Sequence, residues 1–255
     1  MSKLTSTCVL FACLALAGCA TSASRKPADP RDPLEPFNRV MFKVNDRLDR
    51  AFAKPVAKTY KRVVPRPAQT GVTNFFSNLR RPAVMVNDLL QAKWRPAAHD
   101  AGRFLLNSTL GLGGLLDPAS AAGLDRNDED FGQTLGKWGM PAGPYLMMPL
   151  FGPATLRDAT GAAVDELADP VNYVEEDKVR WSLWGLSLID RRARLLEIEG
   201  ALERAYDPYA VLRSVYLQRR EYQVKDGNVP VDEEEMLEDP EPEADAETEA
   251  PPPEG

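Results

Sequence analysis

The chain contains one imidazole, His99, and its surroundings bear on whether the protein could catalyse hydrolysis. A hydrolase needs a nucleophile and a base within reach of each other, and the base is usually histidine. His99 lies in the run Ala97-Ala98-His99-Asp100, which is typical of a surface or capped histidine. The run Gly185-Leu186-Ser187-Leu188-Ile189 lacks the closing glycine of a nucleophile elbow. We therefore expect a protein that is not an enzyme.

Metal and nucleotide sites are not indicated either. Zinc sites take histidine and thiolate ligands, which are scarce in this chain. The acidic cluster from Asp125 to Asp130 lacks the glycine and the closing glutamate of a calcium-binding loop, so we expect a solvated loop. The run Gly111 to Leu116 begins like a dinucleotide-binding loop, but Leu116 stands where the third glycine should be. Helix packing explains these glycines better, and we expect no cofactor.

Cys19 is the residue whose position predicts covalent chemistry. Residues 1–18 carry an apolar run from Cys8 to Ala17, which is typical of a signal peptide and too short to span a bilayer. The last four residues, Leu16-Ala17-Gly18-Cys19, resemble a bacterial lipobox, in which the thiol is acylated and the chain is cut before it. The other two cysteines leave with the signal peptide, so Cys19 has no partner for an internal disulfide. We expect N-acyl and S-diacylglycerol groups at Cys19, and Ala20 after it favours the outer membrane.

Composition divides the mature chain into a tether, a body and a tail. Residues 19–33 are rich in Ser, Ala and Pro and predict a flexible tether, followed by a helical domain over residues 34–226. Residues 227–255 are strongly acidic and are predicted to be disordered. Without these acids the body is mildly basic, which is compatible with anionic lipid headgroups. We expect no nucleic-acid partner.

Apolar residues at helical spacing predict an all-α body. A first helix is expected from Phe37 to Phe52, ending before Pro55. Further helices are expected over Val72–Leu79, from Pro82 to Leu90, from Leu156 to Leu167, from Leu195 to Ala205, and after Asp207-Pro208.

Two long apolar runs, interrupted by Gly and Pro, do not fit a soluble helical bundle. The run Phe104 to Leu116 contains the candidate apolar residues Leu105, Leu106, Leu110, Leu112 and Leu115. The run Gly143 to Pro153 contains the candidate lipid-contacting residues Tyr145, Leu146, Met147, Met148, Leu150 and Phe151. A buried connector and a re-entrant or interfacial segment explain these runs equally well. Trp181 and Trp184, at helical spacing, fit either a membrane interface or a core pair.

Several blocks between Asp32 and about Tyr222 carry a family resemblance. They are Asp32–Arg39, Asn74–Leu79, Pro82–Gln91, Arg103–Gly111, Phe131–Gly136, Gly143-Pro144-Tyr145 running to Leu156-Arg157-Asp158, and Asp207–Tyr209. In this order they resemble the MlaA (also called VacJ) family of outer-membrane lipoproteins. The acidic tail lies outside the resemblance.

The resemblance implies a ring-shaped single domain of amphipathic helices, lying in the inner leaflet of the outer membrane and anchored on its periplasmic side. It implies binding to trimeric porins and transfer of mislocalised phospholipid from the outer leaflet to a soluble periplasmic carrier of the Mla type, which maintains lipid asymmetry. The alternative is a structural lipoprotein that stabilises porins or the envelope without moving lipid. Copurification with a porin would fit both hypotheses, whereas lipid flux would distinguish them.

Overall fold

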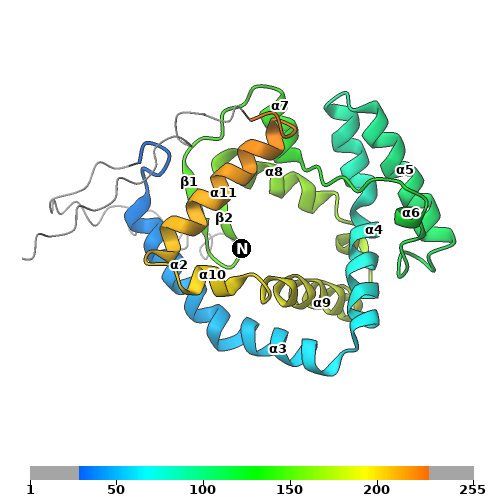
Figure 1. Ribbon diagram of the computed structural model, residues 1–255, viewed down its shortest axis with the longest axis horizontal. Coiled ribbons are helices and arrows are strands. Elements are labelled where there is room, and N and C mark those ends of the chain that lie inside the picture. The colour runs from blue at the N-terminus through cyan, green and yellow to red at the C-terminus, as the bar shows by residue number, and fades with distance from the viewer. Residues whose placement is uncertain (1–28, 230–255) are drawn as a thin grey trace, which may run out of the picture.

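The computed structural model describes residues 29–229, so the signal peptide, Cys19 and the acidic tail from residue 230 lie outside the described residues. Its elements are α2 (Glu35–Leu48), a π-helical turn (Asp49–Ala53), α3 (Lys54–Val63), α4 (Arg66–Leu90), α5 (Trp94–Thr109), α6 (Pro118–Ala121), α7 (Phe131–Lys137), β1 (Tyr145–Met148), β2 (Gly152–Thr155), α8 (Leu156–Leu167), a 3-10 turn (Pro170–Tyr173), α9 (Asp177–Leu195), α10 (Glu199–Glu203) and α11 (Pro208–Val224). The helices follow one another around a ring, and α11 crosses back from the start of the ring towards α7 (Figure 1). The prediction of a mostly helical ring is confirmed. Between residues 29 and 229, no helix has both the length and the hydropathy that crossing a membrane requires.

The first helix does not stop before Pro55, contrary to the prediction. Its path continues from α2 through the π-helical turn into α3. In that turn the backbone N–H of Lys54 donates to the carbonyl of Asp49, five residues earlier. Pro55 has no backbone N–H to donate. It is the second residue of α3, and the regular α-helical hydrogen bonding is already interrupted by the π-helical turn just before it.

Pro82 does not begin a helix, because the two helices predicted on either side of it are a single helix, α4. An internal proline removes a backbone hydrogen bond and clashes with the preceding turn. Contacts of the turn directly before Pro82 offset this cost. Asn78 Nδ2 donates to Ser108 Oγ at 2.9 Å, and Arg81 Nη1 donates to Asp100 Oδ1 at 2.7 Å. Both contacts tie α4 to α5.

The apolar face predicted from Leu195 to Ala205 is divided between two helices. Helix α9 ends at Leu195, and the short α10 starts at Glu199. The bend between them brings the carboxylate of Glu199 back to Arg192, which also binds Asp49. The predicted helices after Pro153 and at Asp207-Pro208 are confirmed as α8 and α11.

A β-hairpin, which the sequence did not predict, lies between α7 and α8. Strands β1 and β2 are antiparallel, with Tyr145 opposite Thr155 and Met148 opposite Gly152. Side chains of β1 alternate, so that Tyr145 and Met147 point into the core and pack with Tyr209 of α11. Partly buried residues of α2 and α11 complete this cluster, namely Met41, Phe42, Leu212, Tyr216 and Leu217.

Outside this cluster the interior contains many polar side chains, while large apolar side chains are exposed. Asp32, Asn38, Asp88 and Asp100 are fully buried. Exposed apolar side chains occur on many elements, among them Phe52, Trp94, Leu110, Phe151, Leu167 and Ile198. This distribution is the reverse of the usual one in soluble proteins, where charged residues are seldom fully buried.

Candidate functional site

The hairpin is attached to α2 by two asparagine side chains. Asn38 Nδ2 donates to the Tyr145 carbonyl at 3.0 Å, and Asn38 Oδ1 accepts from the Met147 N–H at 2.8 Å. Asn45 Nδ2 donates in the same way to the Met148 carbonyl at 2.9 Å. The two asparagines are about two helical turns apart, so they lie on one face of α2. Their side chains form hydrogen bonds with backbone groups at the free edge of β1, as a neighbouring strand would. The sequence analysis missed both residues, although their spacing along the first apolar stripe is a visible signal.

The hairpin divides the predicted lipid-contacting segment into a buried part and an exposed tip. Tyr145 and Met147 are core residues, because their strand alternates between the two faces, and they do not face lipid. Leu150 and Phe151 at the tip are each 77% exposed. Leu150 has φ 66°, a left-handed conformation that is uncommon for a bulky residue. The intervening Leu146 and Met148 are half-buried. Lipid contact at the tip stays a prediction.

The second apolar run presents its leucines at the end of α5 and in the turn that follows. Leu105, Leu110, Leu112 and Leu115 are exposed, and Leu106 is half-buried. The backbone here is tightly wound, with positive φ at Leu112, Gly113 and Gly114. A Cβ added to Gly114 would lie 2.6 Å from the Cβ of Asn78, so this turn approaches α4 too closely for a side chain. Close packing accounts for Gly111 and Gly114, and a positive φ accounts for Gly113.

Asp117 fixes the end of this turn. Arg103 Nη2 donates to Asp117 Oδ2 at 2.8 Å, and Asn107 Nδ2 donates to Asp117 Oδ1 at 2.9 Å. Burial alone would raise the pKa of Asp117, but hydrogen bonds from Ser120, Asn107 and Arg103 outweigh it and lower the pKa to about 2. The exposed leucines are therefore carried by a turn that an ionised carboxylate holds in place.

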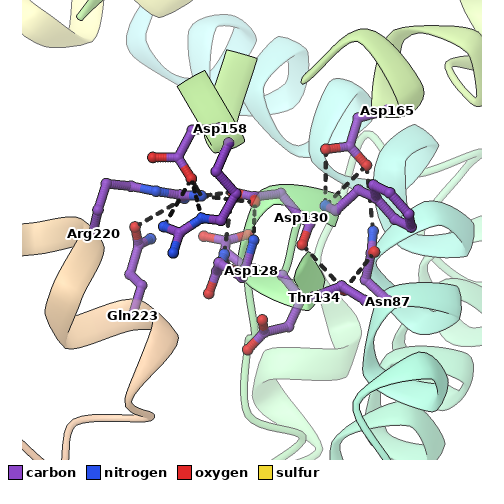
Figure 2. Close-up of polar contacts among 12 residues, drawn as sticks. Asn87, Asp128, Asp130, Thr134, Asp158, Asp165, Arg220 and Gln223 are labelled. Atoms are coloured by element: carbon purple, nitrogen blue, oxygen red, sulfur yellow. Dashed lines mark hydrogen bonds and ion pairs between the residues drawn. The ribbon is translucent and has the colours of Figure 1, made fainter. Parts of the chain in front are cut away.

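Helix α11 is joined to α7 and α8 through Arg220 (Figure 2). Its guanidinium donates to Asp130 Oδ2 at 2.6 Å and to Asp158 Oδ1 at 2.8 Å. Tyr216 donates its hydroxyl to Asp158 Oδ2 at 2.8 Å. Burial would raise the pKa of Asp158, but Arg220 lowers it to about 2. The acidic cluster predicted to be a solvated loop is thus in part structural, because Asp130 binds α11 and caps α7.

The other end of α11 is joined to the chain before α2. The carboxylate of the fully buried Asp32 accepts hydrogen bonds from Asn38, the Tyr209 hydroxyl and Arg213. Burial, and then the hydrogen bond to Asp32, raises the pKa of Tyr209. With Arg220 at its far end, α11 links the N-terminal part of the ring to α7 and α8 and fixes the hairpin between them.

Two fully buried carboxyl groups face each other between α4 and α5. Asp100 Oδ1 is bound by Arg81, and Asp88 Oδ1 accepts from Asn127 Nδ2 at 2.7 Å. The second oxygen of each carboxyl accepts from no donor within residues 29–229. Burial, and then the neighbouring Asp100, raises the pKa of Asp88 to about 7. The pair therefore retains a proton at a pH where an exposed aspartate has lost it.

The structure gives Ser187, the serine of the run compared with a nucleophile elbow, a structural role. Ser187 lies inside α9, and its hydroxyl donates to the carbonyl of Trp184 at 2.8 Å, so it is not held on a sharp turn. Over residues 29–229, no three His, Cys, Asp or Glu side chains are grouped so that they could hold a metal ion.

Comparison with known proteins agrees with this architecture. The sequence profile of the MlaA lipoprotein family matches residues 30–223. The chain is 38% identical over 222 residues to the intermembrane phospholipid transport system lipoprotein MlaA of Escherichia coli (strain K12), covering 84% of this chain and 86% of that relative. The lipoprotein of the same name from Haemophilus influenzae is 35% identical over 236 residues, covering 90% of this chain and 94% of that relative.

A solved structure described as "Structural basis for maintenance of bacterial outer membrane lipid asymmetry" shares the fold. It superposes with a TM-score of 0.67 at 40% sequence identity and covers 76% of this chain and 98% of that chain. The family profile spans both apolar runs, the hairpin and nearly all of α11. The chain therefore belongs to the MlaA lipoprotein family.

Proposed function

We propose that this protein is the outer-membrane lipoprotein of an intermembrane phospholipid transport system. It removes phospholipid that is mislocalised in the outer leaflet and passes it to a soluble periplasmic carrier, which maintains lipid asymmetry. Its relatives from Escherichia coli and Haemophilus influenzae bear the name of such a transport lipoprotein.

The observation that carries this proposal is the distribution of polar and apolar side chains. Soluble monomers rarely expose contiguous apolar patches larger than about a few hundred Å². Here exposed apolar side chains occur at the hairpin tip, at the end of α5 and on several other helices. Buried ion pairs such as Arg81 with Asp100 hold the ring together from within. Such a body suits a lipid environment, in which apolar side chains are tolerated outside and polar groups must find partners inside.

The anchor and the partners are part of the proposal. Cys19 carries the N-acyl and S-diacylglycerol groups, and more than one chain is needed for stable anchoring because a single acyl chain binds a membrane only marginally. The anchored ring lies on the periplasmic side of the outer membrane, where trimeric porins and a periplasmic carrier of the Mla type are within reach. We propose that the exposed leucines and the hairpin tip make lateral contact with lipid, which their apolar, solvent-exposed side chains support.

A purely structural lipoprotein that stabilises porins remains the second candidate, because its surface would need the same apolar residues. Lipid movement separates the two. In a strain lacking the gene, we expect outer-leaflet phospholipid to increase and the wild-type gene to reverse the increase. The variant Cys19→Ser should be left unprocessed, should leave the outer membrane and should fail to reverse it. Unchanged outer-leaflet phospholipid together with reduced porin stability would favour the structural role instead.

A further inference from the structure

Helix α9 presents an exposed stripe that none of the contacts described so far uses. Trp181, Trp184, Leu188 and Leu195 are exposed and, at spacings of three, four and seven residues, share one face of the helix. The two indole rings meet edge to face with centroids 5.7 Å apart. The tryptophans therefore form part of a surface and not a core pair, which was one of the two alternatives from the sequence.

Arg191 lies beside this stripe, about 20° from Trp184 around the helix axis, and the residues on the opposite face of α9 show which way it points. Ile189 lines a cleft of about 430 Å³ against Val56 and Tyr60 of α3, and Ala193 is buried. At about 100° per residue, Ile189 and Ala193 are each about 160° away from Arg191 around the helix axis. Arg191 therefore points away from α3, which lies beside α9 in the ring (Figure 1).

The guanidinium of Arg191 has no carboxylate at ion-pair distance among residues 29–229, although other charged groups are near. Arg194, on the same helix, is already paired with Asp190. On α4, Arg80 approaches Asp169 only to 3.9 Å. Arg80 on α4 and Arg191 on α9 are thus two incompletely neutralised guanidinium groups, near enough for the charge of one to act on the other.

The surroundings of Arg191 favour an added anion. Burial, and then the charges of Arg80 and Arg194, lower the pKa of Arg191, while Glu166 and Asp169 act in the opposite direction. Its side chain is nevertheless open to solvent. The neighbouring arginines destabilise the positive charge of Arg191, so a bound anion would stabilise it. Arginine binds phosphate through charge-assisted, bidentate hydrogen bonds.

We propose that the α9 stripe binds one phospholipid, with its phosphodiester at Arg191 and an acyl chain along Leu188, Trp184 and Trp181. From Arg191 back to Trp181 the helix rises about 15 Å. This is half of the roughly 30 Å hydrocarbon thickness of a bilayer, and therefore the depth of one leaflet. The inference rests on the proposed function and adds the place where the lipid is recognised. Because the phosphodiester is common to phospholipids, the site does not select among headgroups.

The two tryptophans provide a direct test on the full-length, acylated protein in a non-ionic detergent. The substitutions Trp94→Phe and Trp138→Phe leave Trp181 and Trp184 as the fluorescent residues. Phosphatidylglycerol with brominated acyl chains is then titrated, since bromine quenches indole fluorescence on contact. We expect quenching, and we expect Arg191→Gln to raise the half-quenching concentration by about tenfold or more. Arg191→Lys should lose less than this, because it keeps the charge.

Two controls make the result specific to the phosphate. Arg95→Gln on α5 changes the same charge at an arginine without an ion pair among the described residues, and it should leave the titration unchanged. Brominated diacylglycerol, which lacks the phosphate, should quench the wild type and Arg191→Gln equally. Equal titrations of wild type and Arg191→Gln with the brominated phospholipid would overturn the assignment of Arg191. An unquenched wild type would overturn the whole site.

The same strains distinguish failure of this site from failure of the proposed function. If the wild-type gene clears outer-leaflet phospholipid but its tryptophans are not quenched, the lipid uses another surface and the transport function stands. If the wild-type gene does not clear it, the proposed function fails whatever the fluorescence shows.

Discussion

The side chain of Asn45 holds the backbone of Leu150, whose N–H donates to Asn45 Oδ1 at 2.8 Å. The same amide donates to the Met148 carbonyl, so one side chain spans the start of the hairpin turn. Leu150 adopts a left-handed conformation there, which costs free energy for a leucine. The hydrogen bonds from α2 offset this cost and present an exposed apolar side chain at a fixed position.

Asn45→Ala should loosen the hairpin tip. It removes both hydrogen bonds, so we expect the free energy of unfolding to fall by about 1–3 kcal/mol and the amides of Met148 and Leu150 to exchange faster with deuterium. Denaturant titration in detergent and hydrogen exchange measure the two effects. Asn74→Ala is the matched control, because the Asn74 amide makes one long hydrogen bond of 3.3 Å. Unchanged exchange at the tip would show that Asn45 does not hold it.

Met147→Asp and Leu150→Asp should have opposite consequences. Met147 is 2% exposed, so an unpaired charge there should cost several kcal/mol and reduce helicity. Leu150 is at the surface, and aspartate tolerates the left-handed conformation better than leucine, so this variant should remain folded in detergent. If the tip contacts lipid, Leu150→Asp should nevertheless raise outer-leaflet phospholipid in cells. Loss of helicity in Leu150→Asp would place the tip in the core.

Asp88→Asn should change how stability depends on pH. The folded-state pKa of Asp88, about 7, lies above its ordinary value of 3.8, so folding takes up a proton between these values. Its contribution to stability is therefore complete below about pH 4 and is lost as the pH rises to about 7. The amide cannot ionise and should make the protein more stable than the wild type at pH 8, with a smaller gain at pH 5. Urea titrations at both values test this, and equal gains would contradict a shared proton.

Arg220→Gln should separate α11 from α7 and α8. It removes the guanidinium that Asp130 and Asp158 share and leaves Asp158 only its neighbour Arg157, and breaking such a buried pair costs about 3–5 kcal/mol. Because Arg220 lowers the pKa of Asp158, this stabilisation is present above the ordinary pKa and is lost as the pH falls towards 2. The difference from wild type should therefore shrink in acid. Arg219→Gln, at a neighbouring residue without an ion pair in the described chain, should have little effect at any pH.

The sequence predicted elements whose signals are local and missed those that depend on tertiary contacts. Asp207-Pro208 marks the start of α11 because an aspartate cap and a proline in the first turn act within a few residues. Pro82 is a local stop signal, yet contacts between α4 and α5 outweigh it. The hairpin has no polar alternation, because the outward-facing residues of β1 are apolar as well, so its period of two could not be seen.

The candidate site was partly predictable for the same reason. An uncharged run interrupted by Gly and Pro is unusual, and it drew attention to Leu150 and Phe151, which the structure exposes. Which residues of the run face inward depends on the strand register, so Tyr145 and Met147 were grouped with them. Arg191 could not be singled out from the sequence. Its direction follows from α3, which packs on the opposite face of α9, and its electrostatic surroundings include Arg80 on α4.

The polar interior also determines how the protein should respond to temperature. The heat capacity of a protein increases when unfolding exposes apolar area and decreases when it exposes polar area. Here many side chains withdrawn from solvent are polar, while many large apolar ones are already exposed. The heat-capacity change of unfolding should therefore be smaller than the roughly 12–15 cal/mol/K per residue that is typical of globular proteins. A smaller change gives a flatter stability curve, so the ring should keep nearly the same stability in cells grown in the cold and in the warm.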